Sequence, residues 1–277
     1  MRTRPDLRQT YGLKWNPFSP DVPVEALWRS QELETFCWRL ERLVRDGGFA
    51  LVTGEPGSGK SVALRQLAHH LAQTPDVAVG VLTRPQSALA DFYRELGHLF
   101  AVPLVPHNRW AGFKTLRETW TTQIESTRYR PVLLVDEAQE VPTPVLAELR
   151  ILASTDFDSR SLLTVVLAGD GRLTRHFRRE DLLPIASRIR VRLHLGYLLP
   201  DQLLGWLDHV LDQAGRPDLV TPEVRHTLAE HAAGNLRILA NMANDLLETA
   251  ARRQLEQIDA QLYFDLFNPK PVARATP

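Results

Sequence analysis

The chain has 277 residues, with 33 basic and 33 acidic side chains, 44% hydrophobic residues and one cysteine. This composition excludes disordered, collagenous and low-complexity proteins, and it indicates a globular protein of one large domain or two smaller ones. The sequence has no stretch of about 18 apolar residues and no apolar segment behind its charged N-terminus, so we expect neither a membrane span nor a secretion signal.

The single cysteine and the charge distribution bear on compartment and partners. Cys37 lies in an amphipathic stretch, so we interpret it as a thiol in or near the core and expect a reducing, cytoplasmic compartment. Residues 160–192 hold eight arginines and three acidic residues, whereas residues 196–277 hold eleven acidic and seven basic residues. The basic segment is either a solvated face or a surface for an anionic partner.

The first 30 residues are rich in proline and irregular, and we expect residues 1–30 to form an N-terminal extension that packs on the core. Strand and helix patterns then alternate as far as residue 196. The expected elements are helix 31–45, strand 49–53, helix 60–72, strand 77–82, helices 88–99 and 112–126, strand 132–135, helix 144–153, and strands 162–168 and 189–195. Strands separated by helical crossovers predict an α/β fold, a parallel sheet covered by helices on both faces.

The pattern changes near Gly196, after which only helical periodicity remains. The expected helices are 201–213, 222–232, 235–252 and 259–267. The sequence therefore predicts an α/β core over residues 31–196, a small all-helical domain over residues 197–268, and a flexible tail over residues 269–277.

The loop after the first strand carries a phosphate-binding motif. Its residues fit the pattern G-x-x-x-x-G-K-[ST] between a buried strand and a helix: Gly54, Glu55, Pro56, Gly57, Ser58, Gly59, Lys60 and Ser61. Glycines let backbone N–H groups turn toward a phosphate, and the helix N-terminus adds positive potential. We expect Lys60 to reach the β- and γ-phosphates of ATP and the Ser61 hydroxyl to coordinate Mg²⁺.

Two acidic residues end the strand at 132–135. Asp136 follows four apolar residues, so it is expected at the carboxyl edge of the sheet, where it is the second Mg²⁺-side group. Glu137 is then placed to orient or deprotonate a water that attacks the γ-phosphate. A P-loop kinase that must exclude water has no need of this second acid, so Glu137 favours hydrolysis.

Strand 77–82 stands between the two motif strands, which separates this chain from P-loop proteins whose two motifs lie on adjacent strands. With the segment LLTVVLAGD and the helical C-terminal domain, this arrangement resembles the AAA+ ATPases. Over about residues 10–260, segments such as GGFALVTGEPGSGKS, LLVDEAQ and GNLRILAN resemble the ATPase domains of general secretion pathway protein A (ExeA-type) and of TniB/TnsC-type transposition ATPases. The resemblance implies an AAA+ ATP hydrolase with a helical lid, ATP and Mg²⁺ as cofactors, and a ring or helical homo-oligomer, hexamer-like in form.

The resemblance also implies roles for three further residues. Asp170, after the fourth strand, would be the sensor that bonds the attacking water or the γ-phosphate, although a turn-forming role suits it equally well. Arg188 would be the arginine finger that enters a neighbouring subunit's site, with Arg190 as its alternative. Arg237, at the start of a lid helix, would be the second sensor. A guanidinium suits phosphate because it is always charged and donates two parallel bonds; for each arginine a surface salt bridge is the other interpretation.

Contacts with DNA are a weaker inference from the same resemblance. Arg84, Lys114 and Arg117 are candidates to face a central pore and touch a DNA backbone, because related oligomeric ATPases do so. A solvated helix face with ordinary core tryptophans at Trp110 and Trp120 is the alternative.

The leading hypothesis is an ATP-dependent DNA-binding regulator of transposition that selects target DNA and recruits a transposase. Secretion members of the resembling family carry a membrane segment and a cell-wall-binding part after the ATPase domain, and residues up to 277 contain neither, which favours a role without a membrane. The alternatives are an ATPase that assists assembly of a secretion or cell-envelope complex, and a small-molecule P-loop kinase.

Overall fold

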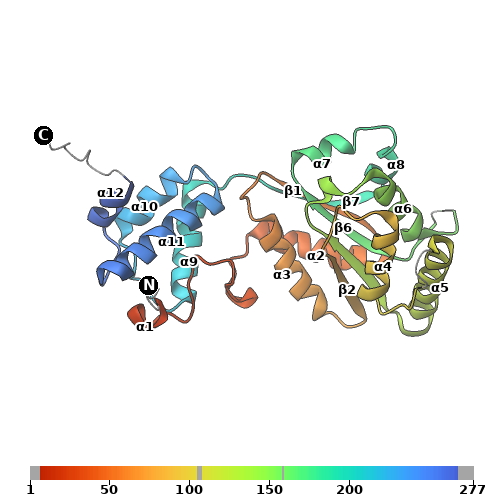
Figure 1. Cartoon of the computed structure of the whole chain (residues 1–277), viewed down its shortest axis with the longest axis horizontal. Coiled ribbons are helices and arrows are strands. Elements are labelled where there is room, and N and C mark those ends of the chain that lie inside the picture. Colours follow the sequence, from red (N-terminus) through yellow and green to blue (C-terminus); the bar gives the residue numbers. More distant parts are fainter. Residues whose placement is uncertain (1–6, 105–107, 158, 268–277) are drawn as a thin grey trace, which may run out of the picture. The chain divides into compact units, whose positions relative to one another are not determined.

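The computed structural model describes residues 7–104, 108–157 and 159–267. The chain divides into two compact units: residues 29–196 form one, and residues 1–28 together with 197–277 form the other. Figure 1 shows an α/β unit with a central sheet and a separate all-helical unit. The expected tail at 269–277 lies outside the described residues.

The described residues of the α/β unit form a five-stranded parallel sheet in the order β2-β3-β6-β1-β7. Its strands are β1 (Gly48–Gly54), β2 (Val77–Leu82), β3 (Arg130–Val135), β6 (Thr164–Gly169) and β7 (Ile189–Leu195). In the chain, β2 stands between β1 and β3, but in the sheet it is β6 that separates them and β2 lies at the edge. The two phosphate motifs therefore lie on non-adjacent strands, as expected, with the end of β6 between them.

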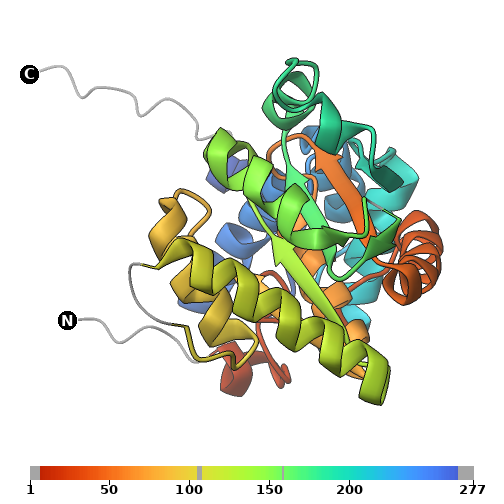
Figure 2. The ribbon, with the colours of Figure 1, turned by 90° about the vertical axis from the view of Figure 1, so that its right-hand side faces the viewer.

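Helices cover both faces of this sheet (Figure 2). One face packs on α2 (Gln31–Asp46) and α3 (Lys60–Ala72). The other packs on α4 (Leu89–Leu99), α5 (Arg109–Thr127) and α6 (Thr143–Ala153). The smaller elements of the unit are η2 (Ala138–Glu140), β4 (Ser154–Thr155), β5 (Arg160–Ser161), α7 (Gly171–His176) and α8 (Leu183–Ala186).

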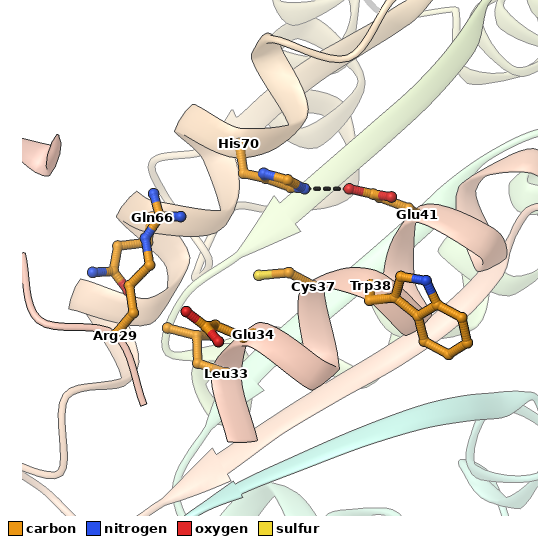
Figure 3. Close-up of a pocket in the computed structure, with 8 residues that line it drawn as sticks. All are labelled: Arg29, Leu33, Glu34, Cys37, Trp38, Glu41, Gln66 and His70. Carbon is orange, nitrogen blue, oxygen red and sulfur yellow. Dashed lines mark hydrogen bonds and ion pairs between the residues drawn. The ribbon is translucent and has the colours of Figure 1, made fainter. Parts of the chain in front are cut away.

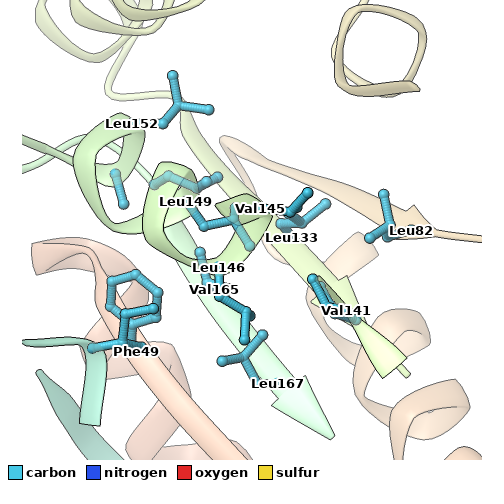
Figure 4. Packing of buried hydrophobic residues seen from close by; sticks show 14 of the residues in the cluster. Phe49, Leu82, Leu133, Val141, Val145, Leu146, Leu149, Leu152, Val165 and Leu167 are labelled. Carbon is cyan, nitrogen blue, oxygen red and sulfur yellow. The ribbon is translucent and has the colours of Figure 1, made fainter. Parts of the chain in front are cut away.

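Alternate residues of each central strand enter the two cores. Leu133, Val165 and Leu167 lie in the cluster beneath α6, where Figure 4 shows them beside Leu146 and Leu149. Their chain neighbours, such as Leu134 and Val166, lie in the cluster with α2 and α3. Because both faces are buried, these strands are continuously apolar rather than alternating. The edge strand β7 does alternate, with buried Val191 and exposed arginines on either side of it.

A buried carboxylate ties three helices together. Glu148 on α6 accepts hydrogen bonds from the Tyr93 hydroxyl on α4, at 2.5 Å, and from the Arg109 guanidinium on α5. Burial opposes the charge on Glu148, but the hydrogen bonds from Arg109 and Tyr93 outweigh it and hold the pKa of this carboxyl below its usual range. Burial and the same contact raise the pKa of Tyr93. The cluster fixes the helical layer that covers one face of the sheet.

The helical unit contains α9 (Pro200–Gln213), α10 (Pro222–His231), α11 (Leu236–Arg253) and α12 (Ala260–Phe267). The N-terminal segment, with α1 (Leu7–Tyr11) and η1 (Val24–Ala26), belongs to this unit. Tyr11, Leu13 and Phe18 share one apolar cluster with residues of α9 to α12, and the Tyr11 hydroxyl donates to the Leu255 carbonyl at 3.0 Å. The segment that was expected to pack on the α/β core thus contributes aromatic side chains to the helical core.

Candidate nucleotide site

The phosphate-binding motif forms a tight loop between β1 and α3. Gly57 and Gly59 adopt φ values of 85° and 97°, in the left-handed region that favours glycine. Gly54 is required for a different reason: a Cβ there would stand 2.4 Å from the carbonyl oxygen of Leu195 on β7 and 2.5 Å from Ser58 Oγ. The glycines thus allow a loop geometry that other residues would obstruct.

Lys60 lies inside this loop and is only 7% exposed. Its ammonium group donates to the carbonyl oxygens of Gly54 and Glu55, at 2.9 and 3.1 Å. Within the described residues these contacts use two of its three protons. A buried ammonium needs compensation by hydrogen bonds or an anion, so the remaining proton suits a phosphate oxygen.

Ser58 gives a second sign that the loop fits a ligand. Its hydroxyl is buried and, among the residues that the structure describes, has no hydrogen-bond partner. Buried polar groups are normally paired, and an orphan inside a phosphate-type loop suits an anion. Ser61, the expected Mg²⁺ ligand, is exposed in the first turn of α3. The residues present therefore fit Mg-ATP.

The acidic pair follows β3 at the same edge of the sheet. Asp136 is half-buried, and one of its carboxylate oxygens accepts the backbone N–H of Glu137 at 2.9 Å. Glu137 is exposed and holds φ 48°, ψ 42°, a left-handed conformation uncommon for a residue with a side chain. The two carboxylates thus follow β3 at the edge of the sheet, Asp136 half-buried and Glu137 exposed.

A residue that sequence reasoning missed joins this pair to the next strand. Gln139 is 5% exposed, its amide nitrogen donates to the Glu137 carboxylate, and its amide oxygen accepts the backbone N–H of Asp170 at 3.3 Å. The available signal was a glutamine two residues after Glu137, between Ala138 and Val141, which are both buried.

Asp170 follows β6, between the ends of β1 and β3, and begins α7 as its N-cap. Its carboxylate accepts the Arg172 backbone N–H at 2.8 Å and the Arg172 side chain at 2.9 Å. Burial opposes its charge, but the hydrogen bonds from Arg172 and the positive charges of Arg172 and Lys60 hold the pKa of Asp170 below its usual range. Asp170 is thus a helix cap within the electrostatic reach of Lys60.

The sequence and the fold of this chain are similar to those of known proteins. Residues 43–177 match the family model described as an AAA domain. In solved structures, Cdc6p from Pyrobaculum aerophilum superposes with a TM-score of 0.71 at 16% identity, covering 87% of this chain and 67% of that one. The Aeropyrum pernix ORC1 protein in complex with DNA superposes with a TM-score of 0.69 at 18% identity, covering 90% and 67%. The fold is that of the P-loop AAA+ ATPases.

A curated relative supports the same family. General secretion pathway protein A of Aeromonas hydrophila is 30% identical over 257 residues, which cover 90% of this chain and 46% of that protein. The chain thus spans less than half the length of this relative. That protein's whole activity does not follow from the matched part.

The arginines considered for the arginine finger and for the second sensor differ in exposure and in the unit to which they belong. Arg188 is half-buried before β7, and its guanidinium donates to the Pro184 carbonyl oxygen. Arg190 is exposed within β7. Arg237 is exposed in the first turn of α11, in the helical unit, so it lies in a different unit from the P-loop.

The residues predicted to contact DNA differ in whether their charged groups are exposed. Arg84 is exposed after β2, and Lys114 is exposed on α5, 3.6 Å from Glu118. The Arg117 guanidinium instead donates to the carbonyl oxygens of Ile151 and Ser154, and burial lowers its pKa. Trp120 is fully buried as a core residue, whereas Trp110 is 72% exposed. Arg84 and Lys114 are therefore the candidates whose charge faces solvent.

A cavity of about 250 Å³ lies between α2 and α3 (Figure 3). It is lined by Cys37 and by the paired side chains of Glu41 and His70, among others, and by none of the predicted site residues. Burial raises the pKa of the Cys37 thiol, which suits the predicted near-core role. Across the described residues, no group of three or more histidine, cysteine, aspartate or glutamate side chains is placed to hold a metal ion.

The close approach of Leu195 and Ser58 to Gly54 predicts that a larger residue there lowers the stability of the fold. Gly54→Ala is expected to destabilise the fold by about 1–3 kcal/mol, the usual result of forcing a methyl group into a filled site, and to weaken nucleotide binding because Ser58 must move. Gly171→Ala is the control, since a Cβ there meets nothing within 4 Å in the described part of the chain. Thermal unfolding and titration with a fluorescent nucleotide measure both effects. Wild-type behaviour of Gly54→Ala in both would contradict the described loop geometry.

Proposed function

We propose that this chain binds and hydrolyses Mg-ATP at Gly54–Ser61 and uses the state of the nucleotide as a switch. The observation that carries the proposal is the buried Lys60 ammonium, with two protons bonded to the loop, beside the orphaned Ser58 hydroxyl. Bound Mg-ATP supplies the phosphate anhydride to be cleaved and a divalent cation that neutralises its charge. Ser61 and Asp136 would hold the cation.

Side chains and backbone groups of this chain would bind the phosphates, activate the water and sense the γ-phosphate. Lys60 and the loop N–H groups bind the phosphates and fix their orientation. Glu137, exposed at the end of β3, takes or orients a proton of water. Asp170 is the proposed sensor beside them, and its negative charge is stabilised by Arg172 and Lys60. Arg237, on α11 of the helical unit, is proposed as the second sensor.

We further propose that hydrolysis requires assembly, with Arg188 acting in a neighbouring copy's site as the charge that stabilises the transferring phosphate. Specific ATPase activity should then rise with protein concentration, and Arg188→Ala should abolish this rise while the monomer still binds nucleotide. Arg190→Ala, at the alternative position two residues away, separates the two assignments: loss of the rise in this variant and not in Arg188→Ala would move the role to Arg190. A flat concentration dependence, where light scattering shows that assembly occurs, would remove the assignment.

The proposed biological role is ATP-dependent DNA binding that regulates transposition, through target selection and recruitment of a transposase. It is supported by the resemblance of the motif segments to TniB/TnsC-type ATPases and by the basic stretch 160–192. The AAA+ fold also occurs in an ORC1 protein whose solved structure is a complex with DNA. Duplex binding that depends on an ATP analogue is the test.

A second role is favoured by a specific observation, the 30% identity to general secretion pathway protein A. In that case the partner would be a protein or envelope component rather than DNA. Within residues 7–104, 108–157 and 159–267, no helix combines the length and hydropathy needed to cross a membrane. Duplex DNA binding separates the two roles directly.

A further inference from the structure

Gln139 is the buried polar residue at the nucleotide edge whose role the motifs do not explain. It lies in η2, two residues after Glu137, with only 5% of its surface exposed. A buried glutamine amide needs hydrogen bonds for both its oxygen and its nitrogen. Here the nitrogen donates to the Glu137 carboxylate and the oxygen accepts the Asp170 backbone N–H.

The chemistry of these two neighbours selects glutamine. An ionised carboxylate only accepts hydrogen bonds, and a backbone N–H only donates, so the residue between them must donate at one atom and accept at the other. A glutamate at 139 would set two carboxylates against each other, and a lysine would offer no acceptor. An uncharged amide of this length meets both requirements.

The fold also makes room for this amide. A Cβ at Gly169, the last residue of β6, would lie 2.5 Å from Gln139 Oε1. Gly169 therefore keeps open the place that the amide oxygen occupies against the strand end. The contact ties η2, after β3, to the end of the neighbouring strand in the sheet.

A hydrogen bond is needed to restrict the position of the Glu137 carboxylate. Its side chain is exposed, and its backbone is in a left-handed conformation. An exposed glutamate samples many rotamers, and a general base acts only from a narrow range of positions. A hydrogen bond from a buried, anchored donor restricts that range.

We propose that Gln139 is the positioning residue for the Glu137 carboxylate, anchoring it to the end of β6 at Asp170. This inference rests on the proposed function, since it assigns Gln139 an effect on hydrolysis that passes through Glu137. Gln139 itself touches neither the phosphates nor the water.

Gln139→Met keeps the length and volume of the side chain and removes both hydrogen bonds. We expect the kcat for ATP hydrolysis to fall about 10-fold, as expected when a hydrogen bond to a charged group is lost, with the dissociation constant for an ATP analogue within about twofold of wild type. In a Glu137→Gln background, Gln139→Met should cause no further loss of kcat, because the two residues act as a unit.

Gly169→Ala is the second variant, since its methyl group would lie 2.5 Å from the Gln139 amide oxygen and 2.9 Å from the Leu173 side chain, and so displaces the amide without substituting Glu137 or Gln139. It should lower kcat in the same direction, whereas Gly171→Ala, two residues along, should leave hydrolysis unchanged. Thermal unfolding of each variant, measured alongside, keeps a fall in kcat distinct from a loss of folded protein.

Three results overturn the proposal. An unchanged or raised kcat in Gln139→Met and Gly169→Ala would show that Gln139 does not help Glu137 or that it restrains it. An equal fall of kcat in the wild-type and Glu137→Gln backgrounds would show that Gln139 acts independently. Wild-type hydrolysis by Glu137→Gln alone would instead remove the proposed base, and the inference with it.

Discussion

Lys60→Ala is expected to lose nucleotide affinity, whereas Glu137→Gln is expected to bind ATP and to hydrolyse it at least about 10²-fold more slowly. The difference follows from the positions of the two side chains. Lys60 is buried in the loop with its ammonium bonded to Gly54 and Glu55, so it acts on the phosphates in the ground state. Glu137 is exposed after β3 and is proposed to act only on the water.

Titration with a fluorescent ATP analogue and single-turnover phosphate release measure the two effects separately. Glu140→Gln is a suitable control because it makes the same substitution three residues further on, at a half-buried carboxylate paired with Arg172. It should leave the hydrolysis rate near wild type. Equal loss of nucleotide binding in Lys60→Ala and Glu137→Gln would refute this division of roles.

Duplex DNA binding is the second large expected effect. With saturating ATP analogue, affinity should be independent of sequence and should weaken steeply between about 50 and 200 mM salt, because phosphate contacts release condensed counterions. Arg84→Ala and Lys114→Ala should each lower affinity uniformly and reduce the slope of log affinity against log salt by about one unit. Both side chains are exposed, so their loss should leave the core intact.

Fluorescence anisotropy of a labelled duplex measures this binding. Arg39→Ala is the matched control, because it removes one exposed charge from α2, which packs on the opposite face of the sheet from α5. No binding at low salt and micromolar protein would end the transposition proposal in favour of the secretion one. Binding that neither substitution affects would keep DNA as the partner and move the contacts to the arginines of residues 172–179.

Local patterns predicted the elements that carry the site. The alternation at 189–195 gave β7 with its observed ends, and the glycine motif placed the loop between β1 and α3. The pairing of strands far apart in the chain leaves no local pattern, so the place of β6 between β1 and β3 appeared only in the structure. The short antiparallel pair β4 and β5 was missed because two residues are too few to show a period.

Two features of the structure depend on contacts between residues far apart in the chain, and local sequence patterns did not predict them. Residues 1–30 were expected on the α/β core, whereas Tyr11, Leu13 and Phe18 share an apolar cluster with residues of α9 to α12. Gln139 was missed because one of its two hydrogen bonds connects segments 31 residues apart, from η2 to Asp170. Sequence motifs identify the groups that touch phosphate, whereas the residues that hold those groups in place are chosen by tertiary contacts.

The central proposal is that Gly54–Ser61 binds ATP and that its hydrolysis requires assembly with a neighbouring copy of the chain. Electron microscopy of the protein with a non-hydrolysable ATP analogue, with and without duplex DNA, tests it most directly. We expect an ordered oligomer in which the β- and γ-phosphates contact Lys60 and an Arg188 from the adjacent copy approaches the γ-phosphate. Nucleotide density outside the Gly54–Ser61 loop, or monomers that persist with the nucleotide bound there, would contradict the claim.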